Sequence, residues 1–267
     1  MTPQIPILDH GYVQFIDAMG SDERIIESAR MSTGKGFLGW GPTCPHCGGK
    51  LLEALAHATP GAMRCVDTKG GVGYGCGVVE PKPGDEKLLR FLWTNKHTSP
   101  FEQCALTVEV MAPIFIFREW HRHRTQSYNE FSARYEKMPD VHYVPTLGRL
   151  KLAGGANKQA GGVADLADDL ALLTWLTEAQ NLQQRVYSHY EAGLDIGVPK
   201  EVARLNTPVS RYSKMVASAN LLNWLRFLGL RMAPNAQWEI RMYANAVGAI
   251  VAERFPRTWS LFQERAL

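Results

Sequence analysis

The stretch Arg122-His-Arg-Thr-Gln-Ser-Tyr-Asn-Glu-Phe-Ser-Ala-Arg134 holds three arginines, a histidine, a glutamate and two serines. Arginine suits a phosphate group because its planar fork donates two parallel hydrogen bonds. Serine hydroxyls and loop N–H groups complete such a cradle, and Glu130 either orients the arginines or accepts from a sugar hydroxyl or base N–H. Pro113 is well placed to begin a helix that enters this stretch and then runs out into a loop. The pattern predicts a site for an anionic ligand, and a solvated basic helix face is the alternative.

Length and composition set the class of protein. The chain has 267 residues, 45% of them hydrophobic, and a formal net charge of +3, which suits one large globular domain with or without a smaller insert. A membrane-spanning helix needs about eighteen or more consecutive apolar residues without charges, and no segment of the sequence meets this requirement. The first twenty residues lack the basic start and continuous apolar run of a secretory signal, so we expect a cytoplasmic protein. The weak, dispersed basic excess is a poor match for a nucleic-acid-binding protein.

Local patterns predict more helices than strands, and therefore an α+β domain. Alternation of apolar and polar residues predicts a strand over 106–111. Helices are expected over 21–33, from Asp85, over 165–192 with Gly193 as the stop, from Pro199, over 216–230 and over 234–254. The Gly-rich and Ala-rich segment 148–162 is expected to be a mobile loop.

Several common catalytic signatures are missing from the sequence. It holds no Gly-x-x-x-x-Gly-Lys-Ser/Thr loop, and its run of glycines around 70–77 does not match Gly-x-Gly-x-x-Gly. No Gly-x-Ser-x-Gly nucleophile elbow is present either. Standard nucleotide-binding folds and serine hydrolases are therefore disfavoured.

Five segments, in order along the chain, resemble the motifs of the flavin-dependent thymidylate synthases. The signature is Arg122-His123-Arg124 followed, after seven residues, by Ser132. The other four are Ala29-Arg30-Met31-Ser32, His97-Thr98-Ser99-Pro100-Phe101-Glu102, Pro199-Lys200-Glu201-Val202-Ala203-Arg204, and Leu230-Arg231 with Ala236-Gln237-Trp238-Glu239-Ile240. The resemblance covers nearly the whole chain except about residues 37–84. It implies an α+β fold in which a mixed or antiparallel sheet packs with long helices.

The resemblance also implies an activity. The expected enzyme is a homotetramer with active sites shared between subunits, which transfers a methylene from methylenetetrahydrofolate to C5 of dUMP. Hydride comes from FAD that NADPH has reduced, so the cofactor carries the hard chemistry and no protein nucleophile is needed. Arg231 would contact and polarise the uracil ring, and Ser132 would act by binding and polarisation rather than by attack.

By the same resemblance, two sets of residues bind the ligands. Residues expected at dUMP are Glu119, Arg122, Glu130, Ser132, Ala133, Arg134, Arg204 and Arg231. Residues expected at FAD are Ser32, His97, Ser99, Arg122, His123, Arg124, Asn220 and Asn235.

Four positions depart from the family pattern. Glu119 replaces a common Gln and either repels an anion or pairs with Arg122 or His123, while Ala133 replaces a common Gly. Leu222 and Asn235 stand where relatives often have Arg and His. These departures keep open an alternative on the same fold, a dUMP hydroxymethylase in which water resolves the intermediate. Cys104 lies in the predicted strand region and is read as a buried small hydrophobe.

Residues 39–84 form a Cys-rich insert that interrupts the single domain of 1–267. Cys44 and Cys47 have the Cys-x-x-Cys spacing of a zinc site, and Cys65 and Cys76 complete a set of four thiolates. A structural Zn²⁺ is the preferred reading over free thiols because the insert has too little apolar content to fold alone. His46 and His57 are reserve ligands. A nucleic-acid-binding role for the insert is disfavoured because its few basic residues alternate with acidic ones.

Overall fold

The computed structural model describes residues 2–41, 51–53, 63–65, 78–79, 84–152 and 168–266. The chain divides into two compact units. The first comprises Met1–Asp17, Leu106–Ala219 and Asn223–Ile250, and the second comprises Ala18–Ala105, Asn220–Leu222 and Val251–Leu267. The predicted α+β class is confirmed. In the part of the chain that the structure describes, no helix is long and apolar enough to cross a membrane.

The first unit is built on a five-stranded sheet with the order β1-β2-β6-β8-β7. Its strands are β1 (Gln4–Ile7), β2 (Gly11–Met19), β6 (Ala105–Pro113), β7 (Ser127–Glu130) and β8 (Tyr212–Asn220). β1 pairs antiparallel with β2, and β7 pairs antiparallel with β8. Every second side chain of β6 is buried, as the predicted alternation requires, so the strand expected at 106–111 is confirmed and is slightly longer.

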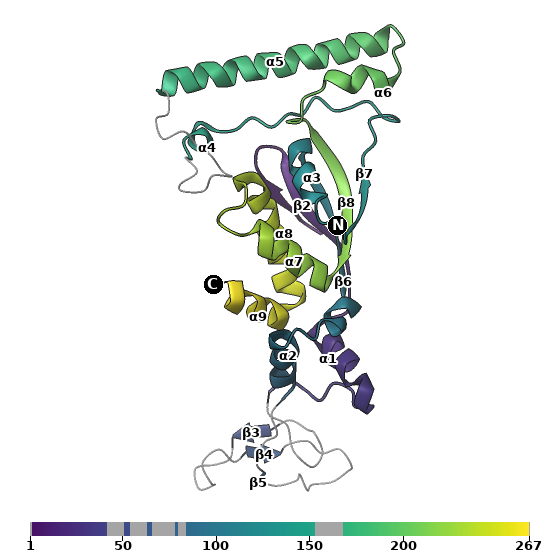
Figure 1. Ribbon diagram of the computed structural model, residues 1–267, viewed down its shortest axis with the longest axis vertical. Helices are drawn as coiled ribbons and strands as arrows, with labels where there is room; N and C mark the ends of the chain where they lie inside the picture. Colours follow the sequence, from purple (N-terminus) through teal and green to yellow (C-terminus); the bar gives the residue numbers. More distant parts are fainter. Residues whose placement is uncertain are drawn as a thin grey trace. The chain divides into compact units, whose positions relative to one another are not determined.

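Helices of the first unit pack on this sheet and extend beyond it (Figure 1). They are α3 (Ile114–Trp120), α4 (Leu147–Leu150), α5 (Asp169–Asp195), α6 (Lys200–Ala203) with the 3-10 turn Arg204–Asn206, α7 (Leu221–Arg231) and α8 (Trp238–Arg254). Trp224 of α7 donates its indole N–H to the Leu106 carbonyl at 2.8 Å, and the Tyr243 hydroxyl of α8 donates to the Met111 carbonyl at 2.9 Å. These buried bonds fix both helices against β6.

Three expectations about this unit were wrong. Residues 216–220 belong to β8 rather than to a helix, because pairing with β6 on one side and β7 on the other outweighs the helix propensity of small residues. α5 passes through Gly193 and ends before Gly197, which takes the left-handed φ of 86° that a helix stop requires. The expected loop 148–162 overlaps helix α4, and its residues 153–162 lie outside the described part.

The second unit contains α1 (Asp22–Arg30), the 3-10 turn Met31–Thr33, α2 (Asp85–Thr94), the 3-10 turn Ser99–Gln103 and α9 (Pro256–Ala266). Buried Asp22 accepts from the backbone N–H groups of Arg257 and Thr258 and from the Thr258 hydroxyl, so it caps the start of α9. Cys104 is fully buried, and burial raises the pKa of its thiol to about 11. The reading of Cys104 as a small hydrophobe is confirmed.

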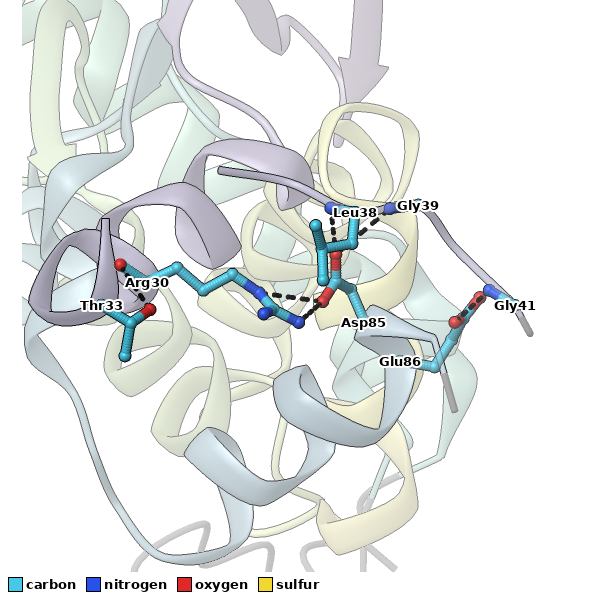
Figure 2. Close-up of polar contacts among 7 residues, drawn as sticks. All are labelled: Arg30, Thr33, Leu38, Gly39, Gly41, Asp85 and Glu86. Atoms are coloured by element: carbon cyan, nitrogen blue, oxygen red, sulfur yellow. Dashed lines mark hydrogen bonds and ion pairs between the residues drawn. The ribbon is translucent and has the colours of Figure 1, made fainter. Parts of the chain in front are cut away.

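Asp85 anchors the base of the Cys-rich insert (Figure 2). Its carboxylate is fully buried, accepts from Nε of Arg30 at 3.1 Å and from a second nitrogen of the same guanidinium, and accepts from the N–H groups of Leu38 and Gly39 at 2.7 and 3.2 Å. Glu86 accepts from the N–H of Gly41 in the same way. Arg30 therefore ties the Ala29-Arg30-Met31-Ser32 motif to both ends of the insert.

Within the insert, the structure describes a three-stranded antiparallel sheet of β3 (Leu51–Glu53), β4 (Met63–Cys65) and β5 (Val78–Val79). Cys65 ends β4 and is buried. The other three expected zinc ligands, Cys44, Cys47 and Cys76, lie outside the described residues.

Candidate functional site

The segment that follows α3 is held in place by an aromatic cluster. Trp120 packs against Phe227 and Trp224 of α7 with ring centroids 4.5 and 6.2 Å apart, and all three side chains are fully buried. The Trp120 indole N–H donates to the Gln126 side chain at 2.9 Å, and the Tyr128 hydroxyl donates to the His123 carbonyl at 2.8 Å. The Arg-His-Arg segment is thus a fixed turn between α3 and β7 rather than a continuation of the helix.

Arg231, the last residue of α7, meets this segment directly. Its Nε donates to Nε2 of His123 at 3.0 Å. Its Nη1 donates to the Glu119 carboxylate at 2.9 Å, and its Nη2 donates to the Glu119 carbonyl at 2.9 Å. A guanidinium has five N–H groups. Two of them, one on each Nη, have no partner among the described residues and remain for a ligand.

The three side chains of this cluster shift one another electrostatically. Burial, followed by the positive charge of Arg231, lowers the pKa of His123 to about 4. His123 is therefore neutral at pH 7 and accepts at Nε2. Burial raises the pKa of Glu119, whereas Arg231 opposes that rise. The expected role of Glu119 at a basic group is thus realised with Arg231 rather than with Arg122 or His123.

A second polar cluster forms where β7 leaves the sheet. Glu130 accepts from the Ser213 hydroxyl of β8 at 2.9 Å. The Ser132 hydroxyl oxygen accepts from the backbone N–H of Arg134 at 3.4 Å, and the Arg134 guanidinium pairs with Glu201 of α6 at 3.2 Å. Because Arg134 and Glu201 are each 55% exposed, this ion pair is weak and is easily exchanged for another anion.

Packing carries this second cluster onto α5 and α6. Ala133 is buried with Met138, Tyr187 and Tyr190, and Ala203 packs against the same group. The Lys200 ammonium donates to the Tyr135 carbonyl at 2.7 Å. Arg204 follows directly after α6, so the turn Ser132–Arg134 and Arg204 belong to one packed region. Ala133 therefore serves as a core residue of this region.

Apart from Arg122, whose side chain is exposed, the expected dUMP residues fall into two groups within the first unit. One comprises Glu119 and Arg231 with His123, and the other comprises Glu130, Ser132, Ala133, Arg134 and Arg204. Among the described residues, no hydrogen bond or ion pair joins a side chain of one group to a side chain of the other.

The expected FAD residues belong to both units. Arg122 and Arg124 are exposed in the first unit, and neither forms an ion pair with a described residue. Asn235 also lies in the first unit, between α7 and α8. Ser32, His97 and Ser99 are exposed in the second unit, which also contains Asn220. The buried side chain of Leu222 belongs to the second unit as well.

Sequence reasoning missed the residues that hold the expected ones. Ser213 had no motif to mark it, because only the pairing of β7 with β8 brings it to Glu130. Glu201 lies inside the Pro199–Arg204 motif, and its charge opposite Arg134 was a signal that could have been used. Within the described residues, no group of three or more His, Cys, Asp or Glu side chains is arranged to hold a metal ion.

The sheet has antiparallel strand pairs at both edges, and neutral His123 and several arginines lie near it. These features define an α+β protein whose candidate anion-binding residues come from several separate elements. A family model described as thymidylate synthase complementing protein matches residues 14–257. The chain is 36% identical to a flavin-dependent thymidylate synthase of Thermus thermophilus over 264 residues, which cover 98% of this chain and 79% of that protein. It is 32% identical to the flavin-dependent thymidylate synthase of Wolbachia pipientis over 262 residues, or 98% and 76% of the two chains. The chain belongs to the flavin-dependent thymidylate synthase family.

Solved structures agree with this assignment. The UMP/dUMP methylase PolB from Streptomyces cacaoi, in its crystal structure with 5-Br dUMP, superposes with a TM-score of 0.68 at 26% identity and covers 97% of each chain. Its structure with 5-Br UMP gives a TM-score of 0.69 at 28% identity, covering 97% of this chain and 96% of that one.

Proposed function

We propose that this protein synthesises dTMP from dUMP, with methylenetetrahydrofolate as carbon donor and reduced FAD as hydride source. In this reaction the C5 proton of the uracil is lost, the methylene carbon joins C5 and tetrahydrofolate leaves. Reduced FAD would supply the hydride that completes the methyl group and would become oxidised. The observation that carries the proposal is the fixed guanidinium of Arg231. Glu119 and His123 hold it on three sides, and two N–H groups remain to donate to a uracil carbonyl and polarise the ring.

The second cluster suits the remainder of the nucleotide. Glu130 is held by Ser213 at 2.9 Å and is available to accept from a ribose hydroxyl. The guanidinium groups of Arg134 and Arg204, with the Ser132 hydroxyl, form a donor set that matches a phosphate. Arg122 is a further cation for the same ligand. This assignment supports dUMP binding without any covalent role for Ser132.

The residues available for FAD fit a cofactor with a pyrophosphate. Arg122 and Arg124 are exposed and form no ion pair with a described residue, so their charges are available to an anion. His123, Ser32, His97, Ser99, Asn220 and Asn235 would complete the FAD site. FAD supplies the hydride when it is reduced, and we propose NADPH as the reductant.

We further propose that copies of this chain assemble into a homotetramer with shared active sites. Two observations support this. The two groups of dUMP residues are not joined to each other by side-chain bonds in the described part of one chain, so a partner subunit can complete each of them. α5 buries only Leu176, Tyr187 and Tyr190 along its described length, and it leaves Leu170 and Trp175 74% and 58% exposed. Such apolar exposure favours burial against another subunit.

The mass of the nucleotide product tests the proposed reaction. Purified protein is mixed with FAD, dUMP, methylenetetrahydrofolate and NADPH at low oxygen. A methyl group gained by dUMP is the expected result, and unchanged dUMP from flavin-loaded protein contradicts the proposal. A hydroxymethyl group would instead assign the alternative, in which water replaces hydride and the departures at Glu119, Leu222 and Asn235 redirect the reaction.

We also propose one structural Zn²⁺ per chain, bound by Cys44, Cys47, Cys65 and Cys76. The burial of Cys65 at the end of β4 supports this proposal, because a bound metal can supply folding free energy to a small insert. Elemental analysis of the purified chain is expected to give about one zinc per polypeptide. Less than about a tenth of that amount would contradict the assignment. The variant Cys65→Ser should lose the metal, and Cys104→Ser provides the matched control outside the insert.

A further inference from the structure

Two basic side chains, His142 and Arg211, lie buried side by side with unused hydrogen-bonding groups. They face each other in an isolated antiparallel bridge, so their side chains share one face. Arg211 is 8% exposed, and the side chain of His142 is also 8% exposed. Nε of Arg211 and Nδ1 of His142 have no hydrogen-bond partner in the described part of the chain. Nε2 of His142 lies 3.4 Å from a carboxylate oxygen of Asp140, which is 38% exposed. Among the described residues, the Arg211 side chain makes one hydrogen bond, which goes to the Tyr212 carbonyl and is long, at 3.4 Å.

The charge of Arg211 makes this arrangement unusual. Arginine keeps its proton in proteins, so the buried guanidinium is a cation. Among the described residues Arg211 forms no ion pair, and the negative charge that acts on it is that of Glu130. An unpaired buried charge is normally strongly destabilising. Burial lowers the pKa of Arg211, the negative charge of Glu130 opposes that change, and the positive charge of Arg204 adds to it. Glu130 and Arg204, which shift the pKa of Arg211, both belong to the second polar cluster described above.

The sheet brings Arg211 to the same end of β8 as that cluster. Ser213, two residues further along the chain, points to the same face and holds Glu130 at 2.9 Å. Glu130 is opposite Met215, and the N–H of Phe131 donates to the Lys214 carbonyl at 2.8 Å. Because β7 and β8 are antiparallel, the chain that continues from Phe131 through Ser132 to Arg134 runs along β8 towards Arg211.

We propose that Arg211, supported by His142, is a further phosphate-binding residue, which approaches the nucleotide phosphate from the buried side while Arg134 and Arg204 approach from the exposed side. The proposal rests on the proposed dUMP function. An incoming phosphate supplies the missing counter-charge to Arg211 and accepts from its unused Nε–H. A fork that donates two parallel bonds is the geometry that phosphate oxygens favour.

Binding of three ligands to the flavin-loaded enzyme tests this role: dUMP, deoxyuridine without phosphate, and inorganic phosphate. Arg211→Gln is expected to weaken binding of dUMP and of inorganic phosphate by roughly tenfold or more, and to leave deoxyuridine binding unchanged. Arg211→Lys should restore part of the phosphate-dependent affinity. Arg185→Gln removes an exposed arginine of α5 that pairs with Glu178, and it serves as the matched control.

Stability separates this role from a purely structural one. Removal of an unpaired buried charge should leave the melting temperature of Arg211→Gln unchanged or raise it. Equal losses of dUMP and deoxyuridine affinity, or a wild-type affinity for phosphate, would overturn the proposal. A melting temperature lowered in both Arg211→Gln and Arg211→Lys would also overturn it. If dUMP is not a substrate, the phosphate titration still reports on Arg211, so failure of the two proposals can be told apart.

Discussion

Three of the five N–H groups of Arg231 are taken by Glu119 and His123, so the guanidinium has one orientation before any ligand arrives. Fixed donors stabilise developing charge better than mobile ones because they need no reorganisation during the reaction. Glu119 also keeps the charge of Arg231 partly neutralised in a half-buried place. Glu119 thus serves as the counter-ion of Arg231.

Replacement of Arg231 by Ala tests its position at the reacting ring. Turnover is expected to fall by a factor of about a hundred or more, because a group aimed at developing charge is lost. Flavin should remain bound, as measured by absorbance of the purified protein. Arg226→Ala on the same helix is the control, since Arg226 is exposed and bonds only to Asn223 among the described residues. Retained turnover in Arg231→Ala would remove this residue from the dUMP site.

The lowered pKa of His123 leads us to expect that the stability of the folded chain depends on pH. Its pKa is about 4 in the folded chain and about 6.5 when unfolded, so the unfolded state binds protons more readily. Its contribution is fully present above pH 6.5 and is lost as pH falls towards 4. In melting experiments, His123→Gln should therefore lose less stability than wild type across this interval. His10→Gln, at an exposed histidine, should keep the wild-type slope. Parallel curves for wild type and His123→Gln would contradict the assignment.

At the scale of elements, local patterns were reliable where a helix or strand carries its own start and stop signals. Acidic residues open α1 and α2, Gly34 takes a left-handed φ of 64° after Thr33, and β6 shows clean alternation. β8 was mistaken for a helix because its register and burial come from its two neighbours. α9 was missed because its start is stabilised by Asp22, which is distant in the sequence. The motifs select the candidate site residues, whereas Ser213 and Arg211 carry no motif and come to their places through strand pairing.

The anchor at α2 predicts a large effect from a small change. Asp85→Asn removes the counter-charge of Arg30 while keeping the size of the side chain, and should cost on the order of 3 kcal/mol of unfolding free energy. Chemical denaturation measures this loss. Glu264→Gln breaks the exposed pair with Arg90 in the same unit and should change stability little. Equal effects of the two variants would show that burial of Asp85 does not matter.

At the scale of the whole molecule, the separation of the two nucleotide clusters predicts complementation between inactive variants. If sites are shared between subunits, co-expressed Arg231→Ala and Arg204→Ala chains form some sites with both arginines present. Random assembly should restore about one quarter of the wild-type activity. Each variant expressed alone is the control and should stay inactive. An inactive mixture of properly assembled chains would indicate that both arginines must come from the same subunit.

The anchored ends of the insert have a consequence for how the chain tolerates change. A Cβ placed on Gly84 would lie 1.7 Å from the Gly41 carbonyl oxygen, and Asp85 and Glu86 bind the backbone N–H groups of Leu38, Gly39 and Gly41. The polypeptide therefore enters and leaves the insert at adjacent positions. What lies between them can be shortened, exchanged or replaced by a foreign module without altering the distance that the rest of the second unit must span. The same point is a natural attachment site for a reporter domain or a surface tether.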